Sequence, residues 1–149
     1  MRGHDLVMDN EEHASSERQH RVLVIDDSPI VLRALVLYLN KLPDFEVVTA
    51  ASFAELEQVL ATTTRAFTVS VADLSLPDTP IGAAVELLQS QFIPVIAYTG
   101  GVSDKERQYL WDHQVVDYVL KTDKGSLEYV TALVQRIVLN PKIGVLIVD

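Results

Sequence analysis

The sequence contains no cysteine among its 149 residues, and this absence removes several kinds of chemistry. Disulfides, thiolate zinc sites, iron–sulfur clusters and cysteine nucleophiles all require a thiol. Any reactive group in this chain must therefore be a carboxylate, a hydroxyl, an amine or an imidazole.

Basic residues and long apolar runs are also scarce. Twelve Lys and Arg stand against 21 Asp and Glu, which gives a formal net charge of −9 and argues against nucleic-acid binding by the surface of this chain. No apolar stretch approaches the ~18 to 20 residues of a membrane span, and the N-terminus lacks the order of a secretory signal. With 48% hydrophobic residues, the sequence predicts a soluble, cytoplasmic protein with one compact domain plus extensions.

Residues 1–20 differ in composition from the rest of the chain. They hold five acidic residues and three of the four histidines, with few apolar side chains. This composition predicts a disordered polar tail. His4, His13 and His20 are irregularly spaced, so no metal site is expected there, and the domain is expected to span residues 21–140.

From Arg21 onwards, short apolar runs alternate with segments of helical period. The predicted strands are residues 22–25, 46–50, 67–72, 93–98 and 115–120. Because these runs lack polar alternation, we expect helices to cover both of their faces. The pattern predicts an α/β fold with a doubly wound, five-stranded parallel sheet.

Each predicted helix has its own start signal. The five helices are expected to begin near Ser28, Ser52, Gly82, Ser103 and Ser126. Ser52 and Ser103 each precede a glutamate by three positions, which is typical of a capping box. The third helix, residues 82–91, is expected to be short, and the last to end near Leu139, just before a proline.

The end of the chain repeats its first predicted strand. Residues 144–149 match residues 21–26 with three identities and two Val/Ile exchanges, one domain length apart. We interpret residues 141–149 as a linker and the first strand of a second, similar domain. A sixth strand of the same sheet is the alternative.

Polar side chains follow four of the five predicted strands. Asp26 and Asp27 follow the first strand, Asp73 the third, Thr99 the fourth and Lys121 the fifth. In a doubly wound sheet, ligands bind beyond the carboxyl ends of the strands. Taken alone, each residue is more simply explained as a turn residue, a helix cap or a solvated side chain. Together, they predict a ligand-binding site at one edge of the sheet.

The composition of this site predicts a divalent cation and phosphoryl chemistry. Three neighbouring carboxylates repel one another unless a cation lies among them, and oxygen ligands alone favour Mg²⁺, or Mn²⁺. A carboxylate can itself attack phosphorus. Asp73 stands alone after a central strand and is the better candidate nucleophile, whereas Asp26 and Asp27 are suited to hold the metal. Thr99 and Lys121 can each bind a phosphoryl oxygen.

Residues 21–140 resemble the receiver domain of two-component response regulators. The segments that carry the resemblance are VLVIDDS at 22–28, VADLSLPD at 71–78, VIAYTG at 95–100 and DYVLK at 117–121. The resemblance implies a flavodoxin-like fold with strand order 2-1-3-4-5. It also implies that Asp73 accepts a phosphoryl group from a histidine kinase or phosphotransfer protein, so that the chain is a phosphoryl acceptor with at most self-phosphorylation and autodephosphorylation.

The same resemblance implies roles in metal binding. Asp27, Asp73 and the main-chain carbonyl of Ser75 would hold Mg²⁺, with Asp26 contributing through water. Lys121 would pair with the phosphoryl group. It is followed by Thr122, where many members of the family have a cis proline, so we expect a trans peptide there.

Thr99 and Tyr118 correspond to the switch positions of the family. When Thr99 is drawn toward the phosphoryl group, the Tyr118 ring is expected to fill the vacated space. This change would alter the face formed by the fourth helix, the fifth strand and the fifth helix, which is also the expected surface of a homodimer.

Two other interpretations of the function remain open from the sequence. The chain can be an unphosphorylated docking module with a receiver fold. It can be a magnesium-dependent phosphatase of the haloacid-dehalogenase type, although those enzymes have a second acid where Ser75 stands. The terminal repeat further implies tandem receivers with a downstream output domain.

Overall fold

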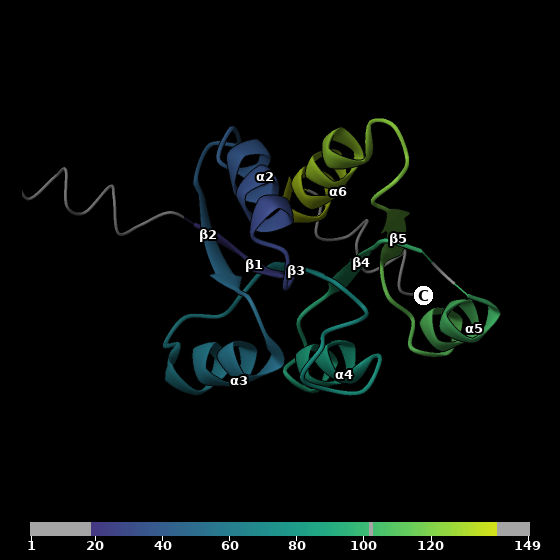
Figure 1. The fold of residues 1–149 in the computed structure, drawn as a ribbon. Helices are drawn as coiled ribbons and strands as arrows, with labels where there is room; N and C mark the ends of the chain where they lie inside the picture. Colours follow the sequence, from purple (N-terminus) through teal and green to yellow (C-terminus); the bar gives the residue numbers. More distant parts are fainter. Residues whose placement is uncertain (1–18, 102, 140–149) are drawn as a thin grey trace, which may run out of the picture.

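The computed structural model describes residues 19–101 and 103–139, in which five strands alternate with five helices (Figure 1). The strands are β1 (His20–Ile25), β2 (Phe45–Ala50), β3 (Val69–Ala72), β4 (Val95–Thr99) and β5 (Asp117–Leu120). The helices are α2 (Pro29–Leu39), α3 (Phe53–Thr62), α4 (Ala83–Ser90), α5 (Asp104–Asp112) and α6 (Ser126–Leu139). The predicted alternation is therefore confirmed over the described residues.

The five strands form one parallel sheet in the order β2-β1-β3-β4-β5. Helices α2 and α6 lie on one face, and α3, α4 and α5 lie on the other (Figure 1). The predicted fold class and strand order are confirmed. In such a sheet, the carboxyl ends of all strands meet at one edge, which positions the site described below.

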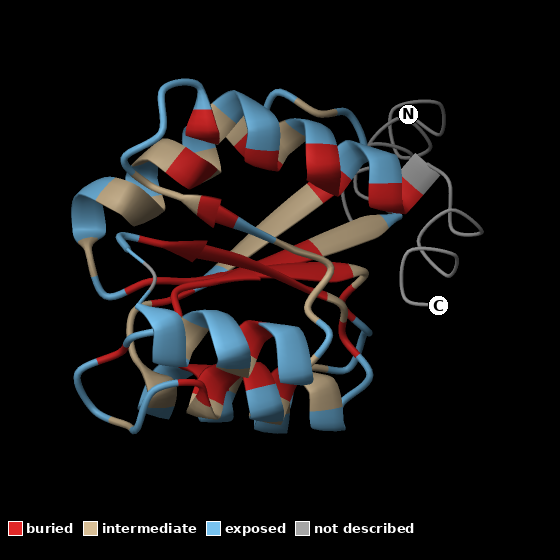
Figure 2. Cartoon of the chain, turned by 90° about the vertical axis from the view of Figure 1, so that its right-hand side faces the viewer, coloured by how far each residue is buried: buried red, intermediate tan, exposed pale blue. Residues whose placement is uncertain are grey.

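The strands are apolar throughout because both faces of the sheet are covered. In β1, Val22 and Val24 pack in the core beneath α2 and α6, whereas Leu23 and Ile25 pack in the core above α3 and α4. All four side chains are buried. Figure 2 shows the buried central strands between two helical layers whose inward sides are also buried. This double burial explains the unbroken apolar runs.

The two predicted capping boxes differ in detail. At α5, the Ser103 hydroxyl accepts from the Glu106 N–H, and the Glu106 carboxylate accepts from the Ser103 N–H, so the box is complete. At α3, the Ser52 hydroxyl accepts from the Glu55 N–H, but the Glu55 carboxylate accepts from Ala51 instead. The second prediction is therefore only half confirmed.

Some predicted boundaries were wrong by one or two residues. Three strands predicted to start at residues 67, 93 and 115 start at Val69, Val95 and Asp117. The start of β4 directly after Pro94 is explained by the proline, which has no N–H to donate to a neighbouring strand. The fourth strand extends one residue further than predicted, to Thr99, and α4 is short, as expected.

His20 belongs to the sheet rather than to the predicted tail. It is the first residue of β1, in register with Phe45 of β2, and its N–H donates to the carbonyl of Asp44 at 3.2 Å. The imidazole and the Phe45 ring lie 5.4 Å apart, centroid to centroid. Local composition placed His20 in the tail, but pairing with a distant strand orders it.

Two predictions lie outside the described residues: the remainder of the predicted tail, 1–18, and the terminal repeat at 141–149. Within the described ranges every peptide bond is trans, including the one between Lys121 and Thr122, as expected. No helix in these ranges is long and apolar enough to cross a bilayer.

Candidate functional site

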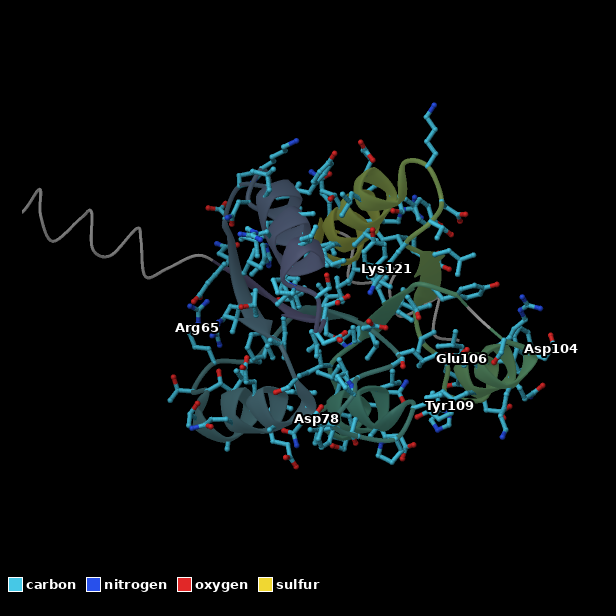
Figure 3. The ribbon with its side chains drawn as sticks, in the orientation of Figure 1. Arg65, Asp78, Asp104, Glu106, Tyr109 and Lys121 are labelled. Carbon is cyan, nitrogen blue, oxygen red and sulfur yellow. The ribbon has the colours of Figure 1, made fainter. Side chains whose placement is uncertain are left out.

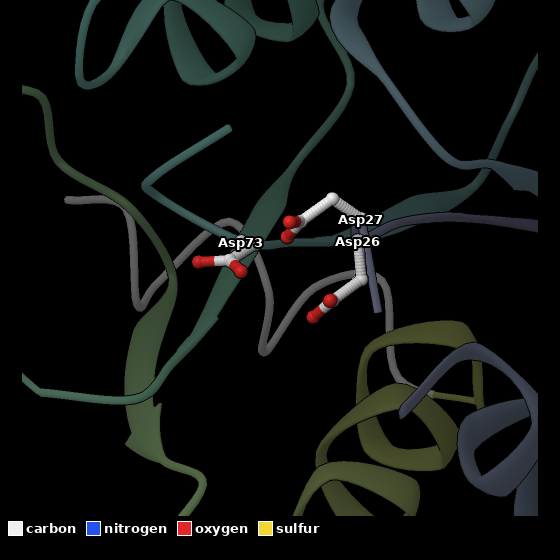
Figure 4. A group of neighbouring side chains, drawn as sticks. All are labelled: Asp26, Asp27 and Asp73. Atoms are coloured by element: carbon white, nitrogen blue, oxygen red, sulfur yellow. The ribbon is translucent and has the colours of Figure 1, made fainter. Parts of the chain in front are cut away.

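Three carboxylates meet at the carboxyl ends of β1 and β3. Asp26 and Asp27 follow β1, and Asp73 follows β3, whose Ala72 is in register with Ile25. One carboxylate oxygen from each aspartate lies within 4.8 Å of the others. Figure 4 shows the three side chains at this edge of the sheet. Parallel pairing of the two strands brings Asp73 beside Asp26 and Asp27, which precede it by 47 and 46 residues.

The Lys121 side chain reaches two of these acids from the end of β5. Its Nζ lies 2.7 Å from Asp26 Oδ2 and 2.9 Å from Asp73 Oδ2. The main-chain N–H of Lys121 donates to the carbonyl of Thr99 at 2.8 Å, which ties the lysine to the end of β4. The structure thus brings together Asp26, Asp27, Asp73 and Lys121, as predicted.

Asp26 is the most buried acid of the site. It is 1% exposed, and burial raises the pKa of its carboxyl, while Lys121 and the Ser28 N–H partly oppose this shift. The Ser28 N–H donates to Asp26 Oδ1 at 2.9 Å. Among the described residues no donor has hydrogen-bond geometry toward the buried Oδ2, whose Lys121 contact is an ion pair. Asp26 Oδ2 lies against the Lys121 ammonium, and the oxygens of Asp26, Asp27 and Asp73 together form the group suited to bind a cation.

Lys121 stays charged in this environment. Burial by itself lowers the pKa of its ammonium group, but the contacts with Asp26 and Asp73 outweigh burial and raise the pKa above the usual value. The lysine therefore offers a fixed positive charge at neutral pH, beside the carboxylate of Asp73.

Asp73 is buried and held at both oxygens. Oδ2 contacts Lys121, and Oδ1 accepts from the N–H of Ser75 at 3.1 Å. Asp27, in contrast, is exposed at the edge of the site. Three carboxylates face one ammonium group in this part of the described chain, and their oxygen donors fit Mg²⁺.

The two expected switch residues occupy different environments. Thr99 ends β4, between β3 and β5, and is buried, with its hydroxyl 3.5 Å from the carbonyl of Gly101. Tyr118, on β5, is 39% exposed. The threonine therefore lies at the edge of the sheet that carries the acids, whereas the Tyr118 ring is partly in solvent.

Two residues outside the predicted set make long-range contacts, Tyr98 beside Lys121 and Asp78 at the start of α3. The Tyr98 ring is buried on β4, its hydroxyl lies 2.8 Å from the Ser126 hydroxyl, and Lys121 Nζ lies 6.0 Å from the ring centroid. Asp78 follows Pro77 and accepts from the N–H groups of the first two residues of α3. A tyrosine in a buried strand indicates that its hydroxyl needs a hydrogen-bond partner. No local pattern in the sequence indicates that Asp78 contacts the start of α3.

Comparison with known proteins identifies the family. A model of the response regulator receiver domain matches residues 22–131. The chain belongs to this family. Among curated proteins, no sequence match was found.

Solved receiver-containing structures resemble this chain closely in fold. One described as a putative two-component system response regulator/GGDEF domain protein is 30% identical, with a TM-score of 0.70, over 82% of this chain and 49% of that chain. The receiver domain of an HD domain-containing protein from Pseudomonas fluorescens Pf-5 is 20% identical, with a TM-score of 0.69, over 83% and 98% of the two chains.

A third structure, the beryllofluoride-activated DrrB receiver domain, is 22% identical, with a TM-score of 0.68, over 80% of this chain and 97% of that chain. The similarity to the Pseudomonas and DrrB structures shows a shared fold and nothing further. This chain spans about half the length of the GGDEF-containing structure.

Proposed function

We propose that this receiver accepts a phosphoryl group on Asp73 from the phosphohistidine of a histidine kinase or phosphotransfer protein. The observation that carries the proposal is the position of Asp73, whose buried carboxylate lies 2.9 Å from the Lys121 ammonium and close to Asp26 and Asp27. Receiver-family membership supports the same reaction class.

The proposed step is a displacement at phosphorus. A carboxylate oxygen of Asp73 forms the new O–P bond as the N–P bond of the phosphohistidine breaks, and the bonding electron pair returns to the imidazole nitrogen. The product is an acyl phosphate. Lys121 can then pair with one phosphoryl oxygen, and Thr99 can donate its hydroxyl to another.

A divalent cation fits beside the nucleophile. Asp27, Asp73 and the main-chain carbonyl of Ser75 would hold Mg²⁺, with Asp26 contributing through water and Mn²⁺ as a substitute. When bound, the metal would offset the negative charge that gathers as a dianionic phosphoryl group approaches three carboxylates. The close approach of one oxygen from each of Asp26, Asp27 and Asp73, all within 4.8 Å of one another, supports this assignment.

The proposed output is a change at the surface formed by α5, β5 and α6. Movement of Thr99 toward the phosphoryl group would make room for the half-exposed Tyr118 ring. This surface would then favour a partner, a second copy of the chain or an output region of a longer protein. Since the donors draw phosphate from ATP, we place the chain in the cytoplasm.

The proposed chemistry is limited to phosphorylation of Asp73 and hydrolysis of the resulting acyl phosphate, so we do not assign the chain as an enzyme. A dehalogenase-type phosphatase would use an acid two residues after the nucleophile. Ser75 occupies that position, and its N–H, rather than its side chain, contacts Asp73.

Mass spectrometry after incubation with acetyl phosphate and Mg²⁺ tests the proposal. The wild-type chain should gain one phosphoryl group that hydroxylamine removes, as expected of an acyl phosphate. Asp73→Asn should gain none, whereas Asp112→Asn, which changes an exposed aspartate of α5, should behave as wild type. A wild-type chain of unchanged mass would overturn the assignment.

A further inference from the structure

Helix α5 is attached to the rest of the fold by few contacts. Leu110 is its one buried residue. The neighbouring Trp111 is 82% exposed, although it is the only tryptophan of the chain. Weakly packed elements open locally at low free-energy cost, so single polar contacts have a large influence on where α5 lies.

Tyr109 supplies such a contact between α5 and the start of α4. Its hydroxyl lies 2.7 Å from the carbonyl oxygen of Gly82 and 2.8 Å from Glu86 Oε2. Figure 3 shows Tyr109 extending from α5 toward α4. Burial, with help from Glu86, raises the pKa of the Tyr109 hydroxyl, so this group remains a proton donor at neutral pH.

The ring of Tyr109 is also fixed. It stacks on His113, with centroids 3.8 Å apart and planes 13° apart. Gln89 of α4 donates from Nε2 to the carbonyl of His113, the residue after α5, which adds a further bond between the two segments. The hydroxyl is therefore held in place from its own helix and aimed at Gly82.

Gly82 connects this contact to the loop that follows β3. Its N–H donates at 3.1 Å to the carbonyl of Leu74, the residue directly after Asp73. It adopts φ +87°, and a Cβ at this position would lie 2.2 Å from Tyr109 Cζ. Only a residue without a side chain lets the α5 tyrosine approach this backbone so closely.

We propose that Tyr109 is a positioning residue that couples α5 to the loop carrying Asp73, through Gly82. The path runs from Leu74 to Gly82 and from Gly82 to Tyr109, and it involves neither Thr99 nor Tyr118. The inference rests on the proposed function, since the state to be communicated is the phosphorylation of Asp73. The contact biases α5 toward the arrangement of the unphosphorylated protein.

Glu86 and Gly82 compete for one hydroxyl proton. The charged carboxylate is the stronger acceptor, so part of the donation goes to Glu86 rather than to the Gly82 carbonyl. Neutralising Glu86 should therefore leave the coupling intact, because the hydroxyl can still donate to Gly82. Removing the hydroxyl should abolish it.

Hydrogen exchange of α5 in the full chain, read by mass spectrometry with and without acetyl phosphate and Mg²⁺, tests this inference. Tyr109→Phe keeps the ring and should speed α5 exchange in the unphosphorylated protein by about 2- to 10-fold. The further change caused by phosphorylation should then be smaller than in wild type. Glu86→Gln should retain the wild-type change.

Tyr38→Phe is the matched control, because the Tyr38 hydroxyl also contacts a carboxylate, that of Glu128, but on the opposite face of the sheet. It should leave α5 exchange unchanged. If Tyr109→Phe speeds exchange equally with and without phosphorylation, its role is structural and the inference fails. Unaltered α5 exchange in the variant, or no response of α5 in phosphorylated wild type, overturns it as well.

The same samples separate the two proposals. If wild-type protein gains no phosphoryl mass, the proposed function and this inference both fail. If it gains one, and the phosphorylation response of Tyr109→Phe equals that of wild type, the coupling role of Tyr109 fails alone.

Discussion

The ammonium nitrogen of Lys121 lies 2.9 Å from Oδ2 of Asp73. The lysine comes from the end of β5 and the aspartate from the end of β3, so the contact crosses β4. A cation is thus held beside the proposed nucleophile before any phosphoryl group arrives. This arrangement avoids part of the cost of bringing charges together during the reaction.

Replacement of Lys121 by Ala should destabilise the metal-free protein. It leaves the buried carboxylates of Asp26 and Asp73 without their ammonium partner, and the free energy of unfolding should fall by about 1 to 3 kcal/mol. Urea unfolding in the presence of EDTA measures this change, and Mg²⁺ should restore part of it. Lys124→Ala, which alters an exposed lysine nearby, is the control. Equal unfolding free energies for both variants would contradict the prediction.

Replacement of Asp26 by Asn should weaken the response to magnesium without destabilising the metal-free protein. Burial raises the pKa of Asp26, so its ionised form is disfavoured in the folded state relative to the unfolded state. Saturating Mg²⁺ at 100 times its dissociation constant would stabilise wild type by about 2.7 kcal/mol. Thermal unfolding with and without Mg²⁺ measures both effects, and a full magnesium response in the variant would refute this role of Asp26.

Removal of the Asp78 carboxylate should destabilise the start of α3 in a pH-dependent manner. Asp78 lies between α3 and α4 in Figure 3, and its oxygens accept from the N–H groups of Phe53 at 3.0 Å and Ala54 at 3.1 Å. These bonds lower the pKa of Asp78 below its usual 3.8. Their contribution is fully present above pH 3.8 and is lost as the pH falls through the lowered value.

Urea titrations at neutral and acidic pH check this prediction. Asp78→Ala should unfold at lower urea than wild type at pH 7, and the difference should shrink in acid. Asp112→Asn, which changes an exposed aspartate of α5, serves as the control. A difference that is constant with pH would mean that the charge of Asp78 has no part in capping α3.

Phosphorylation should protect the Tyr118 ring. The ring is 39% exposed, and the proposed switch moves it inward when Thr99 moves toward the phosphoryl group. Hydroxyl-radical footprinting with and without acetyl phosphate measures the change, with the 48% exposed Tyr129 as an internal reference. Thr99→Ala should still accept the phosphoryl group but lose the protection of Tyr118. Unchanged labelling of Tyr118 in phosphorylated wild type would rule out this switch.

Much of the fold follows from local patterns in the sequence. Unbroken apolar runs such as Val22 to Ile25 indicated strands covered on both faces, and the polar residues directly after them marked the site. Asp26, Asp27, Asp73 and Lys121 could be named because strand ends are visible in sequence and parallel strands end at one edge. Residues that do not lie at the end of a strand could not be identified in the same way.

The remaining features depended on tertiary contacts. His20 joins the sheet because β2 pairs with it, Asp78 reaches the backbone of α3, and Tyr109 contacts Gly82 from another helix. The sequence by itself determined which side chains stand at the ends of the strands, because period and polarity are local properties. Only the tertiary structure decided which of them touch, since contacts between distant segments depend on how the helices pack on the sheet.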